Sequence, residues 1–107
     1  MIEKFIDLDN DANYGIKVGN IIVFMTEQHS GEFALNFALE SDIHGFEWMD
    51  RLTGFGAFKT MLQIKPAAQT LIEWVESQGR KWHVCCDSRR AKLYSRYIPT
   101  EKIYITE

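Results

Sequence analysis

The sequence predicts a mixed α/β domain in which an antiparallel three-strand meander is followed by helix, strand, helix and strand. Apolar residues alternate at period two up to residue 40 and recur at helical spacing from Gly54 onward. The 107 residues suffice for one core, and 46% apolar with 25% charged residues is typical of a folded chain. We therefore expect a single domain over residues 1–107.

The front half of the chain contains the meander. MIEKFIDLD alternates moderately and suggests a short first strand, and the cluster DNDAN after it marks a turn. YGIKV and IIVFM are β-rich runs separated only by Gly19 and Asn20, which indicates a tight hairpin. After the turn-like QHSG, EFALNFALE predicts the next strand because its large apolar residues share one face at period two: Phe33, Leu35, Phe37 and Leu39.

The back half begins with helical periodicity, which Pro66 interrupts. Proline either kinks one long helix or starts a second one, and we favour two helices, the second over residues 66–78 with Gly79 at its C-terminus. KWHVCC then predicts a buried strand, SRRAKLYSRY a short amphipathic helix, and KIYIT a final alternating strand. Pro99 marks the last turn.

Charge divides the chain. Residues 1–50 carry ten acidic and two basic side chains, a balance of −8, whereas residues 51–107 carry five acidic and ten basic ones, a balance of +5. This asymmetry suggests a polyanionic ligand on the C-terminal half, and a solvated surface with segregated charges is the equally good alternative.

Other sequence features argue against a membrane or secreted protein, a disulfide framework and a metal site. No apolar run is long enough to cross a membrane and the first residues do not resemble a signal peptide, so we expect a cytoplasmic protein with no membrane partner. The adjacent Cys85 and Cys86 fit neither a disulfide framework nor a CxxC site, so we expect both to be reduced core residues. The three histidines are too scattered for a metal site, and we predict none.

The segment RLTGFG, residues 51–56, carries the first chemical signal. Gly54 and Gly56 let a backbone approach a ligand closely, and the start of a helix offers unpaired N–H groups with a partial positive charge. Together these features form an anion site. Alone the pattern is weak, since glycine pairs before helices often serve as flexible connections.

A second signal is DSRRAKLY, residues 87–94, which follows a strand and opens a short helix. In this order the two segments resemble the GNAT superfamily of acyl-CoA-dependent N-acyltransferases. Its [RQ]-x-x-G-x-[GA] segment matches Arg51, Gly54 and Gly56. Its N-x-x-A-x-x-x-Y segment is matched in part, by Asp87 and Tyr94, with Ala91 one position late. The resemblance covers residues 14–105.

The resemblance implies a site and a reaction. Main-chain amides after Arg51 would bind the pyrophosphate of the cosubstrate acetyl-CoA: Leu52, Thr53, Gly54, Phe55, Gly56 and Ala57. Arg51 and Lys59 would add positive charge, and Asp87 would belong to the cofactor site. Glu40 would act as general base, with His44 and Glu47 as alternatives, and Tyr94 would protonate the departing thiolate. The acceptor would be an amine, such as a protein lysine or N-terminus.

Three features depart from the family pattern. Only thirteen residues precede the first meander strand, where family members have a strand and two helices that form much of the acceptor site, so the resemblance implies a truncated N-terminal side. Residues 42–50 lengthen the segment before the glycines, and Pro66 interrupts the following helix. Small phage-encoded relatives, including some internal virion proteins, also have a trimmed fold, and the chain resembles these more than a full-length metabolic enzyme.

Each candidate also has a structural interpretation. Tyr94 would simply pack with Leu93 and Tyr97, and Glu40 would be a solvated strand end. The three tryptophans would be packing aromatics, with an acceptor pocket as the alternative for one of them: Trp48, Trp74 and Trp82.

Three functions therefore compete: an acetyl-CoA-dependent N-acetyltransferase, a catalytically inactive GNAT-like phage protein with a binding or structural role, and a nucleic-acid-binding protein. The third would use a basic cluster with Tyr94 and Tyr97 interleaved. We rank it lowest because the first half is acidic and the isoelectric point is about 5.6. A homodimer would cover an exposed sheet edge. The basic cluster comprises Arg80, Lys81, Arg89, Arg90, Lys92 and Arg96.

Overall fold

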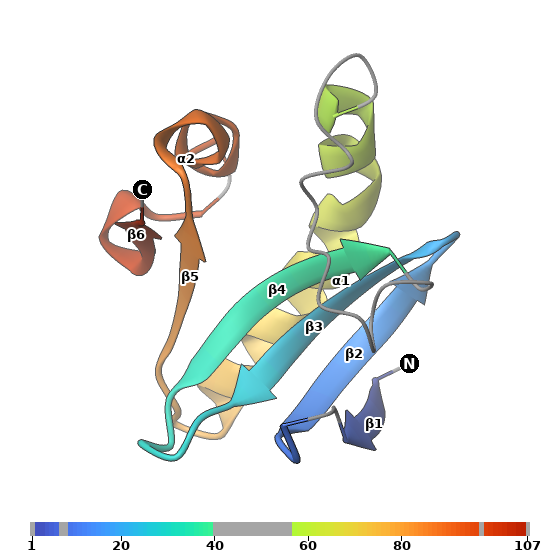
Figure 1. Cartoon of the computed structure of the whole chain (residues 1–107), viewed down its shortest axis with the longest axis vertical. Helices are drawn as coiled ribbons and strands as arrows, with labels where there is room; N and C mark the ends of the chain where they lie inside the picture. Colours follow the sequence, from blue (N-terminus) through green and yellow to red (C-terminus); the bar gives the residue numbers. More distant parts are fainter. Residues whose placement is uncertain (1, 7–8, 40–56, 97, 107) are drawn as a thin grey trace.

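The computed structural model describes residues 2–6, 9–39, 57–96 and 98–106, and for Leu39 and residues 57–61 the backbone alone. These residues form a mixed α/β fold (Figure 1). In chain order its elements are β1 (Glu3–Ile6), β2 (Ala12–Val18), β3 (Ile21–Glu27), β4 (Phe33–Leu39), α1 (Ala57–Ser77), β5 (Trp82–Cys86), α2 (Ser88–Tyr94), the 3₁₀ turn η3 (Thr100–Lys102) and β6 (Ile103–Ile105).

The described strands form one six-stranded sheet in the sequential order β1-β2-β3-β4-β5-β6. Strands β1 to β4 pair antiparallel, while β5 is parallel to β4 and β6 is parallel to β5. The predicted meander is confirmed, and the short first strand extends it to four antiparallel strands. Val18 pairs with Ile21, so Gly19 and Asn20 form a two-residue hairpin, and Gly19 has the positive φ of 62° that such a turn requires.

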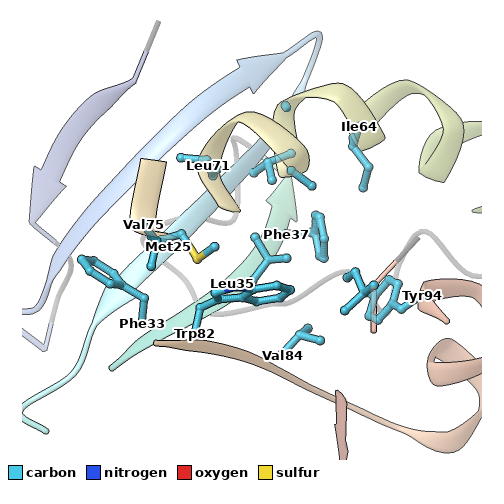
Figure 2. Packing of buried hydrophobic residues seen from close by; sticks show 14 of the residues in the cluster. Met25, Phe33, Leu35, Phe37, Ile64, Leu71, Val75, Trp82, Val84 and Tyr94 are labelled. Atoms are coloured by element: carbon cyan, nitrogen blue, oxygen red, sulfur yellow. The ribbon is translucent and has the colours of Figure 1, made fainter. Parts of the chain in front are cut away.

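Helix α1 covers one face of the sheet (Figure 1). Because successive strand residues point to opposite faces, the odd-numbered residues of β3 and β4 face the helix. Met25, Leu35 and Leu71 are essentially inaccessible there. Figure 2 shows the resulting layer of apolar side chains between the strands and the helix. The alternation that predicted the core face of EFALNFALE is confirmed for Phe33, Leu35 and Phe37.

An aromatic cluster connects the C-terminal half of α1 to the sheet. The ring of Trp74 lies 4.9 Å from that of Tyr14 and 5.8 Å from that of Phe33. The guanidinium of Arg80 stacks over Phe33 at 4.5 Å and pairs with the Glu27 carboxylate at 2.9 Å. Trp74 is thus a packing aromatic, as predicted, and so is the buried Trp82.

The prediction of two helices around Pro66 was wrong, because α1 is continuous from Ala57 to Ser77 with Pro66 inside it. Proline lacks the N–H that would bond to the carbonyl of Leu62, and its ring crowds that carbonyl. Pro66 and Leu62 are both exposed, so water can solvate the carbonyl. The opposite side of the same turns buries Ile64, Ala67 and Ala68 in the core, which holds the two halves in line.

The C-terminus of α1 follows the prediction. Gly79 adopts a φ of 69°, its N–H donates to the carbonyl of Glu76 at 3.0 Å, and the N–H of Arg80 donates to the carbonyl of Val75 at 3.3 Å. These two bonds define a Schellman motif, which needs a left-handed residue and so favours glycine. The motif reverses the chain toward β5.

Replacing Pro66 tests this account of α1. We expect Pro66→Ala to raise the free energy of unfolding by about 1–3 kcal/mol, because alanine restores the missing backbone hydrogen bond at an exposed position. Urea denaturation monitored by circular dichroism measures the change. Gln69→Ala, also exposed on α1, is the control and should change stability by less than about 0.5 kcal/mol. A less stable Pro66→Ala variant would contradict a single continuous helix.

Candidate functional site

The sheet opens between β4 and β5. Their parallel pairing comprises two register pairs, Phe33 with Trp82 and Ala34 with His83. Among the described residues it goes no further, although β4 runs on to Leu39 and β5 to Cys86. Figure 1 shows β5 turning away from β4 toward α2. The two strands therefore form a V whose closed end lies at Phe33.

Contacts at the closed end of the V fix its position. The N–H of Phe33 donates to the carbonyl of Lys81 at 2.9 Å. Arg80 donates from Nε to the carbonyl of Gly31 at 2.7 Å, and His83 Nδ1 lies 2.8 Å from Glu32 Oε1. Each contact joins the β3–β4 turn or the start of β4 to the segment that enters β5. These contacts hold the starts of β4 and β5 together, and the strands diverge from there.

The V contains a cavity of about 260 Å³. Strands β4 and β5 supply most of its wall and α2 supplies the rest. The lining residues are Leu35, Asn36 and Phe37 of β4, Val84, Cys85 and Cys86 of β5, and Arg90 and Tyr94 of α2. This volume is slightly below the range of about 300–1,000 Å³ of pockets that hold drug-sized ligands. It suits a narrow chain or the reactive end of a larger molecule.

Backbone polar groups point into this cavity from both strands. Phe33 directs its N–H toward β5, and in a strand every second residue repeats that direction, so Phe37 presents its N–H and C=O to the opening. The carbonyl of Cys86 accepts from the N–H of Thr106 and therefore faces β6, so the neighbouring Cys85 faces β4. The V thus offers hydrogen-bond donors and acceptors to an extended ligand.

Tyr94 lines the cavity at the C-terminal end of α2. It is 4% exposed, and its ring packs against that of Phe37 with centroids 5.4 Å apart (Figure 2). Burial raises the pKa of Tyr94 far above its ordinary value, the nearby Cys86 and Asp87 raise it further, and Arg90 opposes the shift. The phenol is therefore protonated at every physiological pH. Tyr94 therefore both lines the cavity and packs in the core.

Asp87 is the N-cap of α2. Its Oδ1 accepts from the N–H of Arg90 at 2.8 Å, and its Oδ2 lies 3.3 Å from Nη1 of the same arginine. An acidic N-cap satisfies an unpaired N–H and is stabilised by the positive end of the helix. The carboxylate thus orients Arg90, which lines the cavity, while Asp87 itself does not. Its predicted cofactor contact stays a prediction.

The glycine segment lies outside the described residues, as do Arg51, Leu52, Thr53, Gly54, Phe55 and Gly56. Glu40 and the insertion residues His44, Glu47 and Trp48 lie outside them as well. Of the predicted pyrophosphate amides, Ala57 is described as the first residue of α1. How the glycines lie relative to the helix stays a prediction, because residues 51–56 are outside the described ranges. The first described turn of α1 contains no acidic residue.

The expectation that both cysteines belong to the core was half wrong. Cys86 is buried, but Cys85 is exposed, and neither forms a disulfide. Adjacent residues of a strand point to opposite faces, so two neighbouring cysteines cannot both face α1. Burial, with a contribution from Asp87, raises the pKa of the Cys86 thiol to about 11, and burial also raises the pKa of Cys85.

The remaining predictions concern basic clusters, metals and membranes. Tyr94 is buried and so cannot stack on a base, and Arg80 and Arg90 are engaged in ion pairs, which weakens the nucleic-acid hypothesis. Within the described ranges, no group of three or more histidine, cysteine, aspartate or glutamate side chains is arranged to hold a metal ion. Neither of the described helices combines the length and apolarity that crossing a bilayer requires.

Comparisons with protein-family models, curated proteins and solved structures found no match for this chain. The geometry alone therefore carries the functional argument. Sequence reasoning missed Asn36, Phe37 and Cys85 as parts of a site, since each has a residue type common in strands. The registers implied by the two hairpins would have placed Asn36 beside other polar residues.

Alkylation of the two thiols tests the described orientation of β5. With iodoacetamide on the native protein at pH 8, we expect Cys85 to react at least about tenfold faster than Cys86, because the latter is buried and protonated. Single variants Cys85→Ser and Cys86→Ser separate the rates by mass spectrometry, and urea-unfolded protein is the control in which both react. Equal native rates would contradict the orientation.

The raised pKa of Cys86 also makes the stability of the protein depend on pH. The folded state holds the Cys86 proton more tightly than an unfolded thiol of pKa 9.0 does, so the stabilisation is present below pH 9 and is lost as the pH rises through about 11.

Proposed function

We propose that the protein is a GNAT-type acyltransferase that transfers an acetyl group from acetyl-CoA to an amine. One observation carries the proposal: the V between β4 and β5, with its cavity and with Tyr94 in the wall. The order of a meander, helix, strand, helix and strand supports it.

The shape of the cavity favours a ligand with a narrow, amide-containing arm. Coenzyme A has such an arm between its nucleotide and its thiol, and amide groups hydrogen-bond to backbone groups as a neighbouring strand does. Phe37 and Cys85 offer these backbone groups from the two sides of the V. A cavity of about 260 Å³ is too small for the whole of CoA, so it would take the acyl end of the arm and the nucleotide would lie outside it.

The reaction combines groups of the cavity wall with the sequence-predicted base Glu40, which lies outside the described residues. The nitrogen of the neutral amine attacks the thioester carbonyl carbon, the new C–N bond forms, and the C–S bond breaks. The amine proton passes to a general base, for which Glu40 is the candidate. The N–H of Phe37, directed into the V, stabilises the negative charge that develops on the carbonyl oxygen. The products are an amide and the thiol of CoA.

Tyr94 assists the leaving sulfur chiefly by hydrogen bonding. A thiol has a pKa of about 8.5, and a phenol whose pKa is raised above its ordinary value of about 10 is a much weaker acid. Full proton transfer from Tyr94 to the thiolate is therefore uphill, but a hydrogen bond from the phenol lowers the charge on sulfur as the C–S bond breaks. Solvent then supplies the proton.

A second candidate is a binding protein without turnover. The backbone groups of Phe37 and Cys85 would also pair with an extended peptide inserted as a strand between β4 and β5. This function needs no reacting group, and the tight packing of Tyr94 against Phe37 is compatible with it. Acetyl transfer, and not CoA binding alone, separates the two candidates.

Calorimetric titration with CoA tests the proposed ligand and its location. We expect saturable binding, and we expect Cys85→Trp to abolish it because the indole fills the cavity from an exposed position. Tyr104→Trp, at an exposed residue of β6 that does not line the cavity, is the matched control and should bind normally. No heat at about 1 mM CoA would contradict the proposal, because such binding is weaker than about −4 kcal/mol.

The role of Tyr94 is tested in the acetyl-transfer assay. Tyr94→Phe should retain CoA affinity and lose about 10- to 100-fold in kcat, near the lower end of acid–base contributions, because only a hydrogen bond is removed. Release of free thiol from acetyl-CoA measures the rate. The pH profile of the parent protein should show no loss of rate from Tyr94 ionisation below about pH 10. An unchanged kcat in Tyr94→Phe would contradict this role.

A further inference from the structure

A chain of polar side chains crosses the face of the sheet opposite α1. Asn13 of β2, Thr26 of β3 and Asn36 of β4 share this face because Leu35 and Phe37 point to the core. Asn13 is directly opposite Thr26 in the register of β2 and β3. Asn36 adjoins Thr26 diagonally, since its own partner is Phe24. The chain therefore ends at the strand that borders the V.

The hydrogen bonds of this chain have only one consistent direction. Asn13 Nδ2 lies 3.1 Å from the carbonyl of Asp11, which can only accept, so Asn13 Oδ1 faces Thr26. That oxygen also only accepts, so the Thr26 hydroxyl donates to it at 2.6 Å. Because the single hydroxyl hydrogen of Thr26 is already donated to Asn13, Thr26 Oγ1 acts as the acceptor for Asn36 Nδ2 at 2.9 Å. Each bond fixes the orientation of the next group.

The same reasoning fixes the amide of Asn36. Its Nδ2 donates to Thr26 and also lies 3.3 Å from the carbonyl of Ala34, so both donor hydrogens are used. A flipped amide would place oxygen against the carbonyl of Ala34 and is excluded. Asn36 Oδ1 is therefore an acceptor, and it receives no hydrogen bond from any residue in the described part of the chain. Asn36 is half-buried and lines the cavity of the V.

We propose that Asn36 Oδ1 accepts a hydrogen bond from the nitrogen of the substrate amine and so positions it in the cavity between β4 and β5. This inference rests on the proposed acyl transfer to an amine and identifies the side chain that positions the acceptor, a compound that presents an N–H group. A neutral amine donates one hydrogen to Oδ1 and keeps its lone pair for the thioester carbon. An anion that only accepts hydrogen bonds meets a fixed acceptor and cannot bond to Oδ1.

The charge of the N-terminal half of the protein agrees with an amine as acceptor. Residues 1–50, which include the strands that carry Asn13, Thr26 and Asn36, have a balance of −8. A negative balance attracts the protonated amine that predominates in solution, and the one cation of the described cavity wall, Arg90, is paired with Asp87. The neutral amide of Asn36 then binds the nitrogen without holding it in the charged form, as a carboxylate would. Attraction and positioning thus come from different groups.

The inference is tested first by binding, independently of acetyl transfer. With isotope-labelled protein, NMR follows the Asn36 side-chain amide during titration with butylamine and with butyrate, which has a similar chain but only acceptor oxygens at neutral pH. We expect butylamine to shift the Asn36 signals saturably and butyrate to leave them unchanged. Butyrate binding as tightly as butylamine, or no saturable shift with butylamine, overturns the inference.

Variants then test it in the transfer reaction. Asn36→Leu should raise KM for the amine about three- to tenfold, the equivalent of one hydrogen bond between neutral groups. Thr26→Val removes the hydroxyl that orients Asn36, together with its hydrogen bond to Asn13, and should raise KM less. Thr70→Val is the control, since its hydroxyl bonds to Pro66 on the exposed side of α1, and should change nothing. Unchanged KM in Asn36→Leu overturns the inference.

The outcomes separate the two proposals. CoA binding without amine binding at Asn36 overturns this inference and leaves the proposed acyl transfer in place. Saturable butylamine binding at Asn36 in a protein that does not bind CoA supports the amine site and overturns the acyl transfer.

Discussion

The two-residue pairing of β4 with β5 is the constraint on which the site depends. At one end the strands are tied by the bond from Phe33 to Lys81 and by Arg80, which bonds to Gly31 and pairs with Glu27. At the other end the buried rings of Phe37 and Tyr94 occupy the space between β4 and α2. The cavity lies between this tied end and the two rings, so its wall includes side chains that also stabilise the core.

The two faces of the sheet have different functions around this opening. The face under α1 is apolar, and burial of side chains such as Met25 and Leu35 there provides the main stabilisation. The opposite face carries the chain from Asn13 to Asn36, in which each polar group is oriented by its neighbour. Burying a polar group lowers stability unless the group is hydrogen-bonded. A side chain in this hydrogen-bonded series therefore has little freedom to rotate. Asn36 combines this rigidity with a place on the cavity wall.

Much of the fold could be predicted from period and turn chemistry. The alternation of EFALNFALE, the hairpin at Gly19 and Asn20, and the helix end at Gly79 each follow from local physical chemistry, and each is confirmed. Pro66 was misjudged because tertiary burial of Ile64 and Ala68 outweighs a local preference against proline. The cavity between β4 and β5 could not be predicted, since its wall brings together Phe37 and Tyr94, residues 57 positions apart. The polar chain is an intermediate case: the hairpin register alone pairs Asn13 with Thr26, but only the coordinates orient the Asn36 amide.

The most direct test of the account is hydrogen exchange at two amides of β4. The N–H of Phe33 bonds to Lys81 in the closed end of the V, whereas the N–H of Phe37 points into the open part. Measured by NMR on the native protein without ligand, the amide of Phe37 should exchange at least about tenfold faster than that of Phe33. Equal protection of the two amides would mean that β4 and β5 pair along their whole length, and the site described here would not exist.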